Sequence, residues 1–419
     1  MLNKSLTKKF SLRLLIGTLA TGAMALSYQS NVQALTFNFN FDQSVTTEME
    51  DLVKEAGRLW ENSLYDDVVV NIDVQFGELP DGYLGGSRPS TIRVAYGDAI
   101  QQFGLDQVST DDQDAVANLP TYQDADGNIS ISRLINGTTS SFLGLHHTDT
   151  SVTNLWLTRA NAKALGVMSG DHAAVDAVIR LNSQTNWDLD ATDGIGENQY
   201  DFVGTVLHEL GHSLGFLSGV DVLDFDVITK NYRPNEDYDY VTAMDLFRQS
   251  DSTKGKIKID WTVDSSTEYF SVDGGQTEIA KFTDGAAALF IDNNFQASHF
   301  RSSVNSVMRP ILYAGTQSSI SEVDLRLMDA IGWDRSSVSL TNYRNSLLTY
   351  TTENDSFDSA LSWGGWSNTS YTYNFWQEGS FLASKAGKSA ETQDVPEPNM
   401  ILGLSAITLL GVKSLKKRS

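Results

Sequence analysis

The most informative pattern in the chain is at residues 201–218, which read Asp-Phe-Val-Gly-Thr-Val-Leu-His-Glu-Leu-Gly-His-Ser-Leu-Gly-Phe-Leu-Ser. The apolar residues of this segment recur at helical spacing: Val203, Leu207, Leu210 and Leu214. Asp201 stands at the position of a helix N-cap. His208 and His212 are four residues apart, so their rings lie one above the other on the face opposite the apolar stripe. The segment therefore predicts a helix that packs one face on a core and lines a cleft with the other.

Two histidines at this spacing can bind one metal ion, and here they enclose Glu209. Glu209 is turned about 100° from His208 around the helix, so its carboxylate can reach a metal-bound water without binding the metal. Zinc lowers the pKa of such a water to about 7, and a neighbouring carboxylate can act as general base. The pattern thus predicts a zinc hydrolase with His208 and His212 as metal ligands and Glu209 as the catalytic base.

A hydrolytic zinc site usually has three protein ligands and a water, so one ligand remains to be found. Gly215 is suited to the end of the helix because glycine accepts a positive φ. Beyond it, two side chains could complete the site: Asp221 nearby and His299 far downstream. The residue types alone leave both open.

The extended pattern His208-Glu-x-x-His212-x-x-Gly215 resembles the zinc helix of the metzincin proteases. In most metzincins the third ligand sits where this chain has Ser218, and serine is a poor zinc ligand, so the sequence departs from the common pattern there. The chain is more similar to the leishmanolysin-like metalloproteases, whose helix also ends in Gly-Phe. In that family a third histidine follows an insertion, in a Ser-His-aromatic setting before a methionine turn.

His299 has this setting, as Ser-His-Phe ahead of Met308. The resemblance therefore implies His299 as the third ligand in preference to Asp221, with Met308 as an apolar floor beneath the zinc. Residues 324–333 resemble the closing helix of such domains. The resemblance covers roughly Ala177 to Trp333. It implies a metzincin-like endopeptidase with a twisted mixed sheet, an active-site helix and a Met-turn, acting on protein or peptide substrates.

Outside this helix, strand and helix patterns are mixed. Alternating apolar residues and short apolar runs predict strands at 35–41, 68–76, 91–95 and 177–182. Apolar residues at helical spacing predict a helix at 45–63. Because they follow no regular βαβ rhythm, we expect an α+β catalytic domain over residues 35–336. Residues 222–298 are expected to form an insertion that is partly β, with a hairpin at 269–277. Residues 337–394, rich in Ser, Thr and Asn, are expected to form a small appendage or stalk.

The first 34 residues have the order of a secretory signal peptide. An apolar stretch at 14–26 and the small-residue site Val32-Gln33-Ala34 follow four basic residues: Lys4, Lys8, Lys9 and Arg13. This order predicts export, with removal of residues 1–34.

The C-terminal residues 395–419 mirror that order. Val-Pro-Glu-Pro at 395–398 precedes a mostly apolar run at 400–412, and four basic residues follow: Lys413, Lys416, Lys417 and Arg418. The run is shorter than the ~20 residues of a membrane span. The order resembles the PEP-CTERM sorting signal of exported bacterial proteins, which implies transient membrane contact and cleavage by an exosortase-type enzyme. A permanent tail anchor is the alternative. The expected location is outside a bacterium, secreted or at the cell surface or extracellular matrix.

The chain is strongly acidic, with 30 basic and 53 acidic residues and a formal net charge of −23. Eight of the basic residues lie in the leader or beyond residue 398, where there is no acid, so the remainder is more acidic still. Such a surface repels phosphate backbones, which argues against nucleic-acid partners. The absence of cysteine excludes disulfides and a thiolate zinc site.

Calcium is a second metal to consider, at two acidic loops. Asp124–Asn128 and Asp188–Glu197 offer the oxygen ligands that calcium takes. Neither loop has the full spacing of a calcium loop, and Asp-Gly turns are common without a metal.

Two other functions compete with the endopeptidase. A catalytically silent surface or matrix protein could keep a zinc protease fold, but a purely structural site has no need of Glu209. A zinc amidohydrolase acting on cell-wall or glycan material is the other alternative. The helix pattern and Met308 favour peptide bonds.

Overall fold

A computed structural model describes residues 35–80, 82–139, 142–229, 233–264, 266–285, 295–335 and 385–387. All of these residues belong to one compact unit. The expected leader at 1–34, the sorting segment at 395–419 and the 337–394 appendage, apart from 385–387, lie outside the described residues. None of the described helices is long and apolar enough to cross a membrane.

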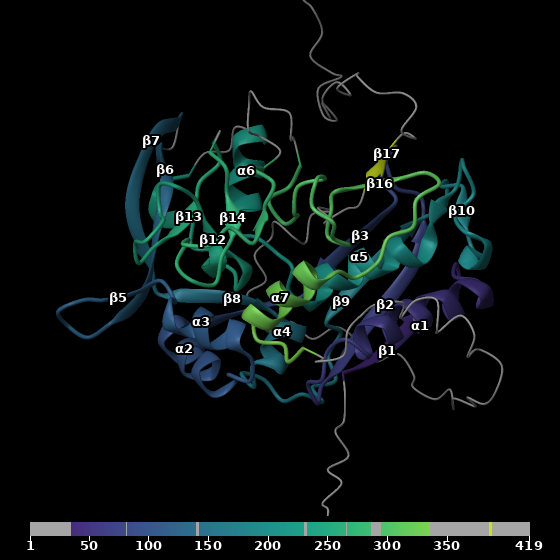
Figure 1. The fold of residues 1–419 in the computed structure, drawn as a ribbon, viewed down its shortest axis with the longest axis horizontal. Coiled ribbons are helices and arrows are strands. Elements are labelled where there is room, and N and C mark those ends of the chain that lie inside the picture. Colours follow the sequence, from purple (N-terminus) through teal and green to yellow (C-terminus); the bar gives the residue numbers. More distant parts are fainter. Residues whose placement is uncertain are drawn as a thin grey trace, which may run out of the picture. The chain divides into compact units, whose positions relative to one another are not determined.

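Four strands hydrogen-bond in the order β1-β2-β9-β3 (Figure 1). Their bounds are Thr36–Phe41 for β1, Val69–Gly77 for β2, Gly85–Pro89 for β3 and Ala177–Asn182 for β9. The sheet is mixed, because β1, β2 and β9 run parallel while β3 pairs antiparallel with β9 at the edge. Alternate residues of β2 are buried, as period-2 spacing predicts: Val70, Ile72 and Val74. The predicted strands at 35–41, 68–76 and 177–182 are confirmed.

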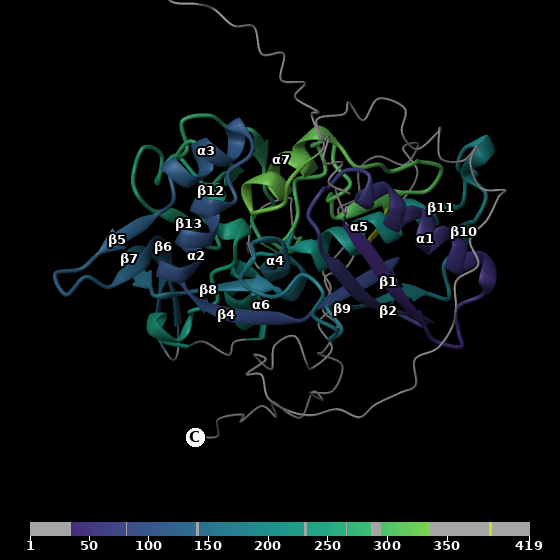
Figure 2. The same ribbon diagram turned by 90° about the horizontal axis from the view of Figure 1, so that it is seen from below.

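The predicted helix at 45–63 is α1 (Thr47–Glu61), which joins the parallel strands β1 and β2. It packs beside α5 (Phe202–Leu214), and α5 in turn contacts β3 and β9 (Figure 2). Trp60 of α1 donates its indole N–H to the Leu207 carbonyl of α5 over 3.0 Å. This bond fixes α1 against the helix that carries the predicted metal ligands.

Capping residues place α5 where the sequence predicts it. Asp201 accepts the Gly204 N–H over 2.9 Å at the first turn, and Gly215, with φ at +131°, follows the last. Trp333 donates its indole N–H to the Leu214 carbonyl over 2.9 Å. The helix is therefore capped by the residues that flank it, and its C-terminal end is also held by a residue from elsewhere in the chain.

The predicted strand at 91–95 is confirmed as β4 (Thr91–Ala95), which pairs antiparallel with β8 (Asn154–Thr158). A further sheet has the order β13-β6-β5, with β7 on β6: β5 is Thr121–Gln123, β6 Ile129–Thr139, β7 Phe142–Val152 and β13 Ile259–Trp261. Three helices accompany these strands: α2 (Tyr96–Leu105), α3 (Thr110–Ala117) and α4 (Arg159–Ala164). Because β13 pairs parallel with β6, part of the expected 222–298 insertion joins this sheet.

Residues 220–335 contribute mainly short elements. An antiparallel sheet has the order β12-β14-β15: Arg248–Gln249, Tyr269–Phe270 and Ala280–Lys281. The pairing of β14 with β15 confirms a hairpin here, with a longer connection than predicted. The remaining elements are α6 (Val220–Thr229), α7 (Glu322–Ala330), β10 (Trp187–Asp188), β11 (Tyr200–Asp201), β16 (Ile311–Tyr313), β17 (Lys385–Gly387) and the 3₁₀ turns η1 (Ala191–Asp193), η2 (Asn235–Asp237) and η3 (Met244–Phe247). The fold is thus α+β, as the sequence predicts.

Candidate metal centre

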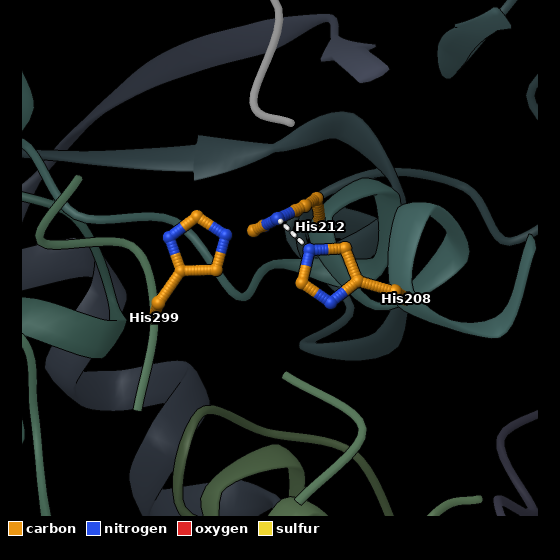
Figure 3. A group of neighbouring side chains, drawn as sticks. All are labelled: His208, His212 and His299. Atoms are coloured by element: carbon orange, nitrogen blue, oxygen red, sulfur yellow. Dashed lines mark hydrogen bonds between the residues drawn. The ribbon is translucent and has the colours of Figure 1, made fainter. Parts of the chain in front are cut away.

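The two histidines of α5 face one another across one helical turn, with their Nε2 atoms 3.1 Å apart (Figure 3). Nδ1 of His208 lies 2.7 Å from the Val307 carbonyl, and Nδ1 of His212 lies 2.7 Å from the Phe216 carbonyl. A carbonyl only accepts, so each Nδ1 carries the hydrogen and each Nε2 presents a lone pair. Two lone pairs at this distance repel one another unless they share a cation. The geometry therefore favours a metal between them.

His299 completes the group (Figure 3). Its ring centroid lies 5.2 Å from that of His208 and 4.9 Å from that of His212. Each of the three offers a ligand atom, and these atoms lie within 4.8 Å of one another. Within the described ranges, no other set of histidine, aspartate and glutamate side chains meets this criterion. All three predicted ligands are thus brought together.

Asp221, the alternative ligand, is bonded elsewhere. Its Oδ1 accepts the Ala297 N–H over 2.5 Å, and its Oδ2 accepts from the N–H and hydroxyl of Ser298. Burial raises the pKa of Asp221 to about 7. Ser218, at the position where the third ligand of most metzincins falls, donates its hydroxyl to Asp245 over 2.5 Å. Asp221 therefore holds the backbone immediately before His299 and lies outside the ligand group.

Burial keeps the α5 histidines uncharged. It lowers the pKa of His208 to about 4, against the opposing effect of the Val307 carbonyl and with a further lowering by the charge of Arg309. Burial also lowers the pKa of His212 well below its usual value, helped by the charges of His208 and His299. Both rings are therefore neutral at pH 7, which is the form that binds a metal. Three imidazole nitrogens are a donor set that zinc takes in catalytic sites.

The turn at Met308 packs against α5. A Cβ on Gly211 would collide with the Met308 sulfur, so the glycine is what lets this side chain approach the helix. Asp324, in the first turn of α7, accepts the Val307 N–H over 3.0 Å and the hydroxyl of Ser306. The segment resembling a closing helix therefore anchors the turn whose Val307 carbonyl orients His208.

Glu209 is fully buried on the same helix. A Cβ built on Gly85 of β3 would lie 2.9 Å from the Glu209 carboxylate oxygen Oε1 and 3.1 Å from Cγ2 of Thr205. The glycine therefore makes the space that this carboxylate occupies. The sequence carried a signal of this contact, because glycine within a strand often marks a close approach, and Gly85 and Gly86 begin β3.

The expected open cleft is not what the described residues form. The exposed fractions of His208, His212 and His299 are 3%, 0% and 1%. The histidine face of α5 is covered by the segment that carries His299 and Val307. The spacing of residues within α5 could not predict this, because the covering segment is brought there by the fold. A small cavity beside His208 is lined by residues of α5, the Met308 turn and β16.

In neither acidic loop do three acidic side chains come together within the described residues. Asp124 accepts from the backbone of Asp126 and Asn128 and from the Asn128 amide. Asp188 accepts from the backbone of Asp190 and Gly196. These contacts are those of capped turns.

The centre combines buried imidazoles from α5 and from a segment far downstream, a glutamate on α5 and a methionine packed against that helix. Sequence reasoning identified these residues but missed the supporting roles of Gly85, Asp221 and Asp324. No protein family, curated protein or solved structure matches the chain.

Proposed function

We propose that the protein is a zinc-dependent endopeptidase with a metzincin-like catalytic domain. The observation that carries the proposal is the convergence of His208, His212 and His299, with Glu209 next to His208 on α5. The mixed sheet, the helix beside its antiparallel edge strand and the methionine turn under Gly211 are consistent with that fold.

Zinc bound by the three histidines would activate a water and polarise the carbonyl of the scissile bond. Glu209 accepts the proton of the attacking water and passes it to the leaving amine. The Val307 and Phe216 carbonyls hold His208 and His212 in the tautomer that presents Nε2. Asp221 keeps the His299 segment in place.

Export belongs to the same proposal. The order of features in residues 1–34 and 395–419 supports secretion from a bacterium or retention at its surface or matrix, after processing by an exosortase-type enzyme. The substrates are then proteins or peptides outside the cell.

A catalytically silent zinc protein is the competing candidate, and the burial of all four residues favours it. The presence of Glu209, a potential general base on the helix that carries two of the proposed ligands, favours catalysis. An amidohydrolase of cell-wall or glycan material would share the centre and differ in its substrate.

The experiment compares bound zinc and casein cleavage for wild type, Glu209→Gln and Glu48→Gln, the last an exposed glutamate of α1. Glu209→Gln is expected to keep zinc and lose roughly 10²–10⁴-fold in turnover, because the general base is gone. Glu48→Gln is expected to match wild type. Zinc binding without cleavage by wild type would support the silent protein, and cleavage of murein or glycan amides alone would support the amidohydrolase.

A further inference from the structure

Arg309 lines the cavity beside the metal ligand His208. It follows Met308 directly, and its Nε donates to the Ser306 carbonyl over 3.0 Å, which orients the guanidinium. The side chain is half-buried. Its position is therefore set by the same turn that orients His208.

The positive charge of Arg309 has no carboxylate partner in the described part of the chain. Arg301 and Arg326, the neighbouring arginines in sequence, are paired with Asp284 and Asp111. Arg309 makes no such ion pair, and among the described residues only the Ser306 carbonyl accepts a hydrogen bond from it. In a chain of net charge −23, an arginine left without an acid beside a candidate active site is unexpected.

The remaining cavity lining is neutral. Ile311 and Leu312 of β16 are apolar, and Thr205 and Ser318 carry hydroxyls. No acidic side chain is part of this lining. Arg309 is only half-buried, so a carboxylate that approached it would meet a guanidinium with several unused donors. Such donors bind carboxylates in a two-pronged geometry.

We propose that Arg309 is a specificity-determining residue that binds the side-chain carboxylate of an aspartate or glutamate next to the scissile bond of a peptide substrate. The inference rests on the proposed endopeptidase function. It draws on the shared cavity wall, because His208 and Arg309 line the same small cavity. A side chain next to the scissile bond would then reach Arg309 when the peptide carbonyl lies at the proposed metal centre.

The test uses peptides with acetylated and amidated ends, identical except for Asp, Asn or Lys beside the cleaved bond. Wild type is expected to prefer Asp over Asn by roughly tenfold or more in kcat/KM, as a charge-assisted hydrogen bond provides, and salt reduces this preference. Arg309→Gln loses the preference, so its kcat/KM values for the Asp and Asn peptides become equal. Arg309→Glu favours the Lys peptide, a reversal that a merely structural arginine would not produce. Arg58→Gln, a half-buried arginine of α1, is the control.

Binding of the same peptides to Glu209→Gln separates this inference from the proposed function. If wild type cleaves nothing, a binding preference for Asp that Arg309→Gln abolishes still supports the anion site. Equal treatment of Asp and Asn by wild type, or a preference that survives Arg309→Gln, overturns it. A third result would also overturn the inference: Arg309-dependent binding seen only with peptides that have a neutral side chain and a free C-terminus. Arg309 would then bind the chain-terminal carboxylate and not a side chain.

Discussion

Asp221 is hydrogen-bonded to the two residues that directly precede His299. Asp221 binds the backbone of residues 297 and 298, and the next side chain is the third imidazole of the centre. In the proposed site His299 is a ligand and Asp221 supports a ligand, so their substitution should have different consequences.

His299→Ala is expected to lower zinc affinity most, because two ligands from one helix fill only one side of a tetrahedral site. Asp221→Asn keeps the shape of the side chain and should weaken zinc by roughly 10–100-fold at most, as loss of a supporting contact does. His172→Ala, at an exposed histidine, should leave zinc unchanged. Zinc retained after equilibrium dialysis against a mild chelator measures all three. Full retention in the His299 variant would contradict its assignment.

Local spacing explains which site residues were predictable. His208, Glu209 and His212 share one helix, so their sequence separation alone sets their directions. His299 reaches them only through the fold, and the residues by themselves left Asp221 equally available. The role of Asp221 was not predictable, because it depends on backbone N–H groups that the sequence does not distinguish.

At the scale of elements, the contact between β3 and α5 determines where the glutamate lies. Gly85→Ala would place a methyl group 2.9 Å from Glu209 Oε1, so the carboxylate must move. We expect a loss of turnover with zinc content unchanged, because the histidines do not touch Gly85. Gly97→Ala in α2, where the nearest atom lies at an ordinary 3.7 Å, is the control. Peptidase activity and bound zinc, measured together, test this, and unchanged turnover would show that Glu209 tolerates the shift.

Elements with a clear period were predictable, and those without one were not. Strands β1, β2 and β9 alternate between the two faces of the sheet, and the helix at 202–214 has both an apolar stripe and caps. β3, with the sequence Gly-Gly-Ser-Arg-Pro, has no such alternation and was not predicted. β13 has only three residues, all of them buried, so neither its existence nor its pairing with β6 shows in a periodic pattern. The burial of the histidine face of α5 was not predicted. The polar residues His208, Glu209 and His212 indicated a face open to a cleft, but segments distant in sequence cover them.

At the scale of the whole molecule, one buried and two half-buried carboxylates lie near one another: Asp66 in the loop after α1, Asp106 at the end of α2 and Asp334 after α7. Burial, and then the charges of Asp334 and Asp106, raise the pKa of Asp66 to about 8. Asp334 donates its backbone N–H to Asp66 over 3.0 Å. Burial likewise raises the pKa of Asp106 and of Asp329 to about 7.

A pKa that is higher in the folded than in the unfolded chain makes stability fall as pH rises. The contribution of Asp66 is fully present below its unfolded pKa of about 3.9 and is lost as pH rises through about 8. Asp66→Asn should therefore raise the free energy of unfolding by on the order of 1 kcal/mol or more at pH 9, with little effect at pH 4. Denaturant unfolding at the two pH values, with Asp67→Asn at an exposed neighbour as control, checks this. An equal effect at both pH values would contradict the raised pKa.

The burial of the three histidines also governs how a metal could leave. A chelator cannot touch an ion held by side chains that are 0–3% exposed, so release must wait for the protein to open. As the chelator concentration rises, the rate of metal loss should therefore approach a ceiling equal to the opening rate. Below that ceiling, the rate of metal loss depends on how well the chelator competes for the ion. At the ceiling, it equals the rate of the opening motion that would also admit a substrate.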